Sequence, residues 1–258
     1  MSLSHAIFLF VAAIVAGTLN SVAGGGSFVS FPALLFTRVP AVEANSTNTV
    51  ALWPGLAASS IAYLKRLDVP RRLLVPLLMA SVLGGLGGAV LLVSTPQHTF
   101  LYLVPWLLLG GTLLFMFGNK ARLLVRDSGI AEERRNVSWK TLAGACALQL
   151  VVGIYGGYFG GGIGFVILGM LAVIGMRDVH SMNAFRALLA AVINAAAVTL
   201  FVIVGAVLWS QFAVMVTGAL IGGWFGARYA QKADPQKLRY LIIAVGLGMS
   251  AYFFVTTK

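Results

Sequence analysis

Two stretches decide how this chain is organised: residues 24–30 read GGGSFVS, and residues 160–166 read GGGIGFV. Each triple glycine lies in a strongly apolar region, although glycine is the weakest helix former after proline. Each is followed by about 11 apolar residues, at 27–37 and 165–175, which as a helix would span roughly 16 Å, or half of a bilayer core. The sequence therefore predicts two short helices that follow glycine turns.

The composition around these stretches is that of a membrane protein. Of the 258 residues, 59% are hydrophobic and only 10% are charged. Six further runs approach the length of about 20 apolar residues that a spanning helix needs. They lie at 44–64, 73–93, 99–118, 182–204, 207–227 and 240–257. A β-barrel would require alternating polarity, and a soluble protein would require polar helix faces, so we predict transmembrane helices.

The second half of the chain repeats the first. The glycines at 17 and 24–26 recur with the same spacing at 153 and 160–162, and LGGLGGA at 83–89 recurs as IGGWFGA at 221–227. The offset between the halves is nearly constant, and a period of this length in a membrane protein points to a two-fold transporter architecture. The predicted units are a first repeat at 1–118, a basic linker at 119–140 and a second repeat at 141–258.

Basic residues in the loops indicate how the repeats are oriented. The loops at 65–72, 119–140 and 228–239 hold most of the 18 lysines and arginines, so the positive-inside rule assigns them to the cytoplasm. The equivalent loops of the other repeat, 205–210 and 94–99, carry no lysine or arginine. Equivalent loops therefore face opposite sides, and both termini are predicted on the outer side. The net charge of +11 then follows from topology and indicates no nucleic-acid partner.

An inverted repeat requires an odd number of crossings in each half. Three full spans satisfy this if the arms at 4–19 and 141–156 enter, turn at the glycines and leave on the same side, and five full spans would also satisfy it. We favour the hairpin, because glycine-rich backbone at membrane depth is tolerated only inside protein or beside a wet cavity. The predicted fold is an all-α integral membrane protein of two inverted-topology repeats, each a glycine-broken re-entrant helical hairpin plus three transmembrane helices.

The glycine turns are predicted to bind an anion. Successive glycines let several N–H groups point to one place, and the helix that follows adds its positive dipole end. Two such turns meeting near the midplane would hold a small oxyanion. The predicted binding residues here are Gly24, Gly25, Gly26, Ser27, Gly160, Gly161 and Gly162. Close helix packing is the other use of glycine, and it is favoured for Gly84, Gly85, Gly88, Gly222, Gly223 and Gly226.

Polar residues at the next helix starts complete the predicted pocket, because polar groups in apolar spans tend to face a cavity. They are Asn45, Thr47, Asn48, Asn183 and Arg186. Helix capping is an equal alternative for Asn45 and for Ser181. Arg186 can either reach back to the cytoplasmic interface or offer a bidentate fork to an anion, and the fork is slightly favoured.

The remaining ionisable residues indicate no enzyme. Glu43 could carry a coupling proton, although an interfacial pair with Arg38 is favoured. His5, His98 and His180 are isolated, and Cys146 is the single cysteine. We predict no catalytic group, metal site or cofactor.

Several ordered motifs resemble one family of transporters. These are GTLNSVAGGGSFVSFPALL at 17–35, ANSTNTVA at 44–51, and RLDVPRR at 66–72 ahead of LGGLGGA. Over essentially the whole chain they resemble the sulfite exporter TauE/SafE family. The resemblance implies a permease of the cytoplasmic (inner) membrane whose substrates are small sulfur oxyanions or organosulfonates, such as sulfite, thiosulfate or sulfoacetate.

The predicted function is secondary transport by alternating access around a midplane anion pocket. With the cell interior negative by about 100 mV, each negative charge that leaves gains about 2.3 kcal/mol, which favours export. A channel-like anion pore and an importer coupled to protons or sodium are the alternatives. The substrate anion and the lipid bilayer are the predicted partners, and a homodimer is left open.

Overall fold

The computed structural model describes residues 1–22, 25–126, 139–176, 178–229 and 235–256, and these ranges are almost entirely helical. The helices are α1 (Leu3–Val22), α2 (Ser27–Phe36), α3 (Ala41–Tyr63), α4 (Arg71–Ser94), α5 (Gln97–Arg126), α6 (Trp139–Tyr158), α7 (Ile163–Val173), α8 (Val179–Val204), α9 (Trp209–Tyr229) and α10 (Pro235–Thr256), with a 3₁₀ turn at Leu64–Arg66. No strand occurs in the part of the chain described.

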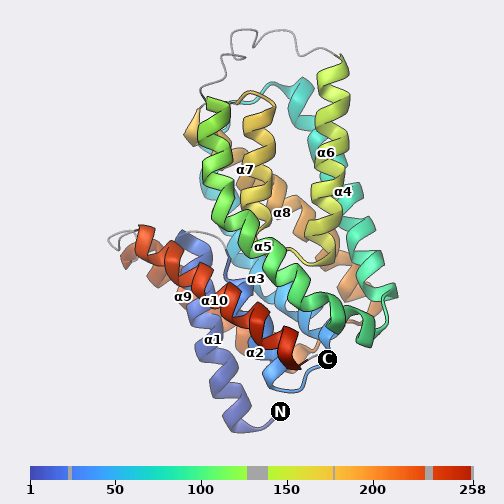
Figure 1. Cartoon of the computed structure of the whole chain (residues 1–258), viewed down its shortest axis with the longest axis vertical. Helices are drawn as coiled ribbons and strands as arrows, with labels where there is room; N and C mark the ends of the chain where they lie inside the picture. The colour runs from blue at the N-terminus through green and yellow to red at the C-terminus, as the bar shows by residue number, and fades with distance from the viewer. Residues whose placement is uncertain (23–24, 127–138, 177, 230–234, 257–258) are drawn as a thin grey trace.

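The six predicted spans correspond to α3, α4, α5, α8, α9 and α10, so the prediction of a helix in each is confirmed. The largest difference is at the end of α5, which runs to Arg126 and makes the first residues of the predicted linker at 119–140 helical. α5 also bends along its length (Figure 1), and it contains Pro105, the usual cause of such a bend.

Both short helices lie where the glycines predict them. α2 has 10 residues and α7 has 11, and each begins within a few residues of its triple glycine. The helices in front of them, α1 and α6, have 20 residues each and are longer than the arms predicted at 4–19 and 141–156. They continue almost to the glycines because a glycine in the last turns of a helix weakens it without ending it.

Four helices among the described residues are long and apolar enough to cross a membrane. Their qualifying segments are Leu3–Ser21, Arg71–Ser94, Thr141–Tyr158 and His180–Val204. Two of these belong to predicted spans, and the other two are the arms in front of the glycine turns. The arms therefore have the length of full spans.

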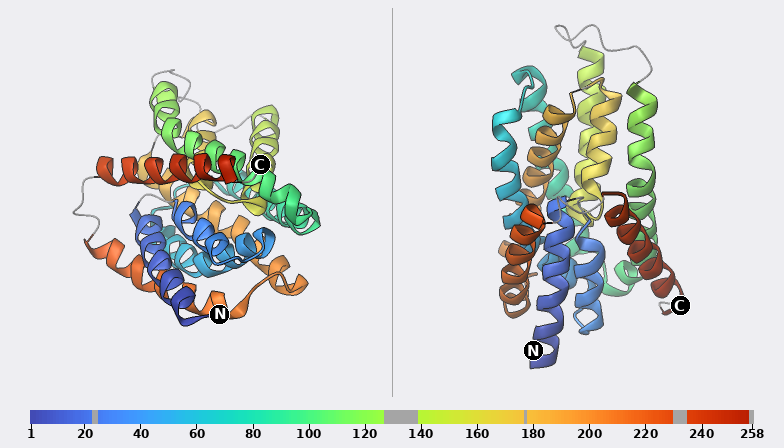
Figure 2. Two further views of the ribbon diagram at one scale, coloured as in Figure 1. Left: turned by 60° about the horizontal axis from the view of Figure 1, so that its bottom comes forward. Right: turned by 90° about the vertical axis from the view of Figure 1, so that its left-hand side faces the viewer.

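The short helices α2 and α7 both begin near the middle of the molecule, and the long helices that precede them come from opposite ends (Figures 1 and 2). α1 begins at the end that carries the N-terminus and runs to the middle, and α2 leads back toward that end. α6 begins at the other end, runs to the middle, and is followed by α7 in the reverse direction.

Glycines let each long arm pack closely on a helix of the other half. α1 lies on α9, where a Cβ added to Gly222 would collide with the carbonyl oxygen of Ile14. α6 lies on α4, where a Cβ on Gly88 would collide with the carbonyl oxygen of Ile154. Gly84, Gly85 and Gly226 likewise have no room for a side chain, and only Gly223 has space. The packing interpretation is thus confirmed for five of these six glycines.

A cluster of aromatic rings lies next to the turns. Phe31 of α2 meets Phe159, just after α6, with ring centroids 5.7 Å apart, and it meets Phe100 of α5 at 6.3 Å, both edge to face. All three rings are almost fully buried. This packing fixes the short helix α2 against the end of α6.

Candidate anion-binding site

The second glycine turn is held by hydrogen bonds to Tyr155. Gly160 and Gly162 have φ values of +75° and +73°, in the left-handed region that glycine adopts without strain. The hydroxyl of Tyr155 donates a hydrogen bond to the carbonyl oxygen of Gly161 at 2.5 Å. The N–H of Gly160 donates to the carbonyl of Tyr155 at 3.2 Å. These bonds tie the turn back to the last residues of α6.

Several N–H groups of this turn remain free. Within the described residues, no backbone acceptor or side-chain oxygen bonds the N–H groups of Gly161, Gly162 and Gly164. They lie at the N-terminus of α7, where the helix dipole places partial positive charge. The turn therefore offers hydrogen-bond donors that lack acceptors.

The side chain of Arg186 lies over the start of α7. Arg186 is in the second turn of α8, and a Cβ added to Gly164 would lie 2.7 Å from Nη1 of its guanidinium. The glycine thus provides the space that the guanidinium fills. The Nε atom is buried and has no hydrogen-bond partner in the described chain. A buried cationic donor without an acceptor is costly unless an anion binds to it.

The first glycine turn is arranged differently. Gly25 has a φ of +112°, and the N–H groups of Gly25 and Gly26 both donate to Oδ1 of Asn20, each at 3.2 Å. These two N–H groups converge on one oxygen, and that oxygen belongs to a side chain of the protein itself. Ser27 is the first residue of α2, and Gly24 lies outside the described residues.

Sequence reasoning missed Asn20. An asparagine a few residues ahead of consecutive glycines, at the end of a helix, can bond nearby backbone N–H groups. That signal is present in TLNSVAGGG at 18–26.

The predicted polar residues of α3 contact three different elements. Nδ2 of Asn45 donates to the carbonyl of Tyr158 at 2.9 Å, and its Oδ1 is buried without a partner in the described chain. Oγ1 of Thr47 accepts the N–H of Leu208, just before α9, at 3.0 Å. Oδ1 of Asn48 accepts the hydroxyl of Ser30 in α2 at 2.5 Å.

The alternative of helix capping is wrong for Asn45 and Ser181. α3 starts after Pro40 with no side-chain cap. The side chain of Asp178 caps α8 by accepting the N–H groups of His180 and Ser181. Both helices begin a few residues earlier than the polar runs indicate.

Of the polar residues at the start of α8, only some lie at the second glycine turn. Arg186 lies there, whereas the hydroxyl of Ser181 bonds the backbone of Asp68 in the loop before α4. Asn183 is partly buried on α8, one turn before Arg186.

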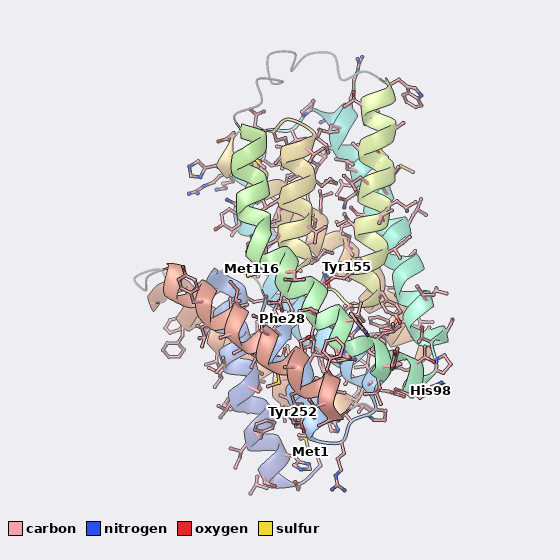
Figure 3. The ribbon with its side chains drawn as sticks, viewed as in Figure 1. Met1, Phe28, His98, Met116, Tyr155 and Tyr252 are labelled. Carbon is pink, nitrogen blue, oxygen red and sulfur yellow. The ribbon has the colours of Figure 1, made fainter. Side chains whose placement is uncertain are left out.

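The two turns are separated by an aromatic ring. Cζ of Phe28 would lie 3.6 Å from a Cβ on Gly162 and 3.1 Å from one on Gly111 of α5, and its Cδ2 would lie 3.3 Å from one on Gly25. The Phe28 side chain is almost fully buried. Figure 3 shows Phe28 and Tyr155 in the middle of the molecule.

The pairing expected for Glu43 is wrong. Its carboxylate accepts a hydrogen bond from Nε2 of Gln97 at 2.5 Å, and Oε1 of Gln97 accepts the N–H of Val42. The glutamine joins the starts of α3 and α5, and in the described chain Arg38 forms no ion pair with Glu43. In the described part of the chain, no group of three or more potential metal-binding side chains occurs.

Comparison with known proteins identifies the family. The family model described as sulfite exporter TauE/SafE matches residues 9–253. "Probable membrane transporter protein ORF9" of Sinorhizobium sp. is 29% identical, covering 94% of this chain and 90% of its own. Two further relatives are each 27% identical and cover 94% of this chain. One is a "Probable membrane transporter protein" of Haemophilus influenzae, of which the match covers 92%. The other is "Probable membrane transporter protein YfcA" of Escherichia coli K12, of which the match covers 87%. No solved structure matches the chain.

The family match covers nearly the whole chain, the named relatives are described as membrane transporters, and the apolar helices agree with a multi-pass membrane protein. The chain therefore belongs to the sulfite exporter TauE/SafE family of membrane transporters.

Proposed function

We propose that the protein is a secondary transporter that moves small sulfur-containing anions, such as sulfite, thiosulfate or an organosulfonate, across the inner membrane by alternating access. The anion binds where Arg186 meets the second glycine turn. The observation that carries this proposal is the buried Nε of Arg186, which has no partner in the described chain. The guanidinium of the same side chain lies at Gly164, at the start of α7, where the N–H of Gly164 has no acceptor in the described chain. Together they supply charge and several directed donors for a tetrahedral or pyramidal oxyanion.

The order and packing of the helices support two inverted repeats. A long helix, a short helix and three long helices follow one another twice along the chain. The packing partners exchange in the same way, because α1 lies on α9 and its counterpart α6 lies on α4, the counterpart of α9. The short helices also exchange, since α7 contacts α5 and α2 contacts α10. Such exchange is what a two-fold axis between the halves requires.

On this proposal the loops at 65–72, 119–140 and 228–239 face the cytoplasm, and both termini face outward. Export is the favoured direction because the membrane potential drives anions out of the cell. An importer would need a coupled proton or sodium ion. Glu43, a carboxylate near the end of α2, is already bonded to Gln97.

Binding is tested first by thermal unfolding of the purified full chain with sulfite, thiosulfate, sulfoacetate, taurine and a neutral control. Ligand at 100 times its Kd stabilises by about 2.7 kcal/mol. We expect saturable stabilisation by at least one sulfur anion, loss of it in Arg186→Gln, and retention in Arg72→Gln, which removes the same charge at an exposed position. If no sulfur anion stabilises the native protein, or if both variants behave alike, the proposal is wrong.

Transport is tested in proteoliposomes. A transporter gives a flux of the bound anion that saturates with concentration, whereas an open pore gives a flux that rises in proportion to it. Flux that responds to an imposed potential without a proton or sodium gradient supports uncoupled export, and dependence on either gradient supports the coupled importer.

A further inference from the structure

We infer that the two glycine turns have different roles: the anion binds at the second turn alone, and the first turn is closed by Asn20, whose amide oxygen occupies the position of an anion's oxygen. This inference rests on the proposed anion transport and assigns the site within it. It differs from the symmetric pocket that the sequence predicts, in which both turns bind the anion. Three pairs of equivalent positions carry it.

The first pair is Asn20 and Gly156, which stand equally far ahead of their triple glycines in the two halves. Oδ1 of Asn20 already accepts the N–H groups of Gly25 and Gly26. At the equivalent place in the second half there is no side chain. A Cβ on Gly156 would collide with the side chain of Ile163, so no acceptor can be supplied from this position.

The second pair is Phe28 and Gly164, each of which is the second residue after its triple glycine. The ring of Phe28 is buried beside its own turn and fills the space next to it. Gly164 has no side chain to fill the matching space, so the guanidinium of Arg186 fills it. An apolar ring thus stands at the first turn where a cation stands at the second.

The third pair is Asn48 and Arg186, which are related by the same offset as the repeated LGGLGGA and IGGWFGA motifs. Asn48 is neutral, and its Oδ1 is bonded to the hydroxyl of Ser30. Arg186 is cationic, and its Nε is buried without a partner in the described chain. Among the described residues, the second turn is therefore the one that combines positive charge with N–H groups that lack acceptors.

The ring of Phe28 also prevents one small anion from touching both turns. It lies within contact distance of the positions that side chains would take on Gly25 and on Gly162. A sulfite-sized ligand held by Arg186 is bonded by the second turn, while the donors of Gly25 and Gly26 stay with Asn20. One anion is bound per chain.

The assignment is tested by calorimetric titration of the purified full chain with sulfite and thiosulfate, followed by hydrogen–deuterium exchange with and without the anion that binds. The expected stoichiometry is one. Peptides that contain Gly161, Gly162 and Gly164 should exchange rapidly without the anion and slowly with it, because their N–H groups gain acceptors. Exchange at Gly25 and Gly26 should be unchanged by the anion.

Two variants complete the test. Asn20→Ala should accelerate exchange at Gly25 and Gly26 and keep the Kd within about threefold, since only local hydrogen bonds are lost. Arg186→Gln should raise the Kd at least about tenfold, the size of a lost charge-assisted hydrogen bond.

The outcomes separate the two proposals. If the native chain binds no sulfur anion, the proposed function fails, and the assignment fails with it. If it binds but the anion protects the first turn as strongly as the second, or Asn20→Ala changes the Kd as much as Arg186→Gln does, the assignment is wrong and anion transport stands. Binding that leaves exchange at the second turn unchanged also overturns the assignment.

Discussion

Replacing Gly164 by alanine should weaken anion binding while leaving the fold intact. The new Cβ would lie 2.7 Å from Nη1 of Arg186 and 3.6 Å from its Cδ, so the guanidinium must move. The movement is at the far end of a flexible side chain, and the backbone need not shift. Alanine also favours the helical state over glycine by roughly 0.5–1 kcal/mol, which offsets the crowding. The free energy of unfolding should therefore change little.

The loss in affinity follows from the displaced charge. A hydrogen bond to a charged group contributes about 1.5–3 kcal/mol, which corresponds to roughly a 10- to 150-fold increase in Kd. The assay is calorimetric titration with the sulfur anion that binds the native protein, together with thermal unfolding without ligand.

A control exists on the same helix. Gly169 of α7 has no heavy atom within 4 Å of an added Cβ, so Gly169→Ala should keep the Kd and leave the melting temperature equal or slightly higher. If Gly164→Ala binds the anion as tightly as Gly169→Ala, the guanidinium does not hold the ligand at this place, and the reasoning about the site is refuted.

Three further substitutions test the packing and the turn. Gly88→Ala should destabilise the protein by about 1–3 kcal/mol in thermal unfolding, because α4 and α6 must separate. The matched control Gly87→Ala, whose Cβ has room, should not destabilise it. Equal melting temperatures of the two variants would contradict the close packing. Tyr155→Phe removes the hydrogen bond to Gly161 and should weaken anion binding by about 1 kcal/mol in titration; an unchanged Kd would mean that this bond does not position the turn. Gln149→Leu removes a buried oxygen that lacks a partner in the described chain, and it also removes the hydrogen bond that Nε2 donates to the hydroxyl of Ser81 at 2.7 Å. Combined with Ser81→Ala, which removes the acceptor as well, it should leave the melting temperature equal or higher. A clear fall in the double variant would mean that the oxygen of Gln149 is bonded.

Helix positions could be predicted well because the membrane leaves few choices. Backbone groups in lipid must be bonded within the chain, so a long apolar run such as 182–204 can only be a helix there. α8 starts a little earlier than that run, at Val179, because the carboxylate of Asp178 caps it. A polar cap is not visible in a scan for apolar residues.

The candidate site could be predicted only in part. A triple glycine indicates a turn with free N–H groups, and Arg186 in an apolar span indicates a partner of opposite charge, but neither shows that the two meet. Their contact depends on how α7 and α8 pack, and on Gly164, an ordinary glycine in sequence. Asn20 and Phe28 were missed for the same reason, since their roles arise from folding back onto the turn.

The close packing of α1 on α9 has a consequence for synthesis of the protein. Oγ1 of Thr18 donates to the carbonyl of Gly222, in the last quarter of the chain. When α1 enters the bilayer, the helix that fits its face of small residues has not yet been made. α6, in contrast, finds α4 already in place. The face of α1 that packs on α9 therefore stays without its protein partner until α9 is made, and a chain that ends before α9 leaves that face uncovered.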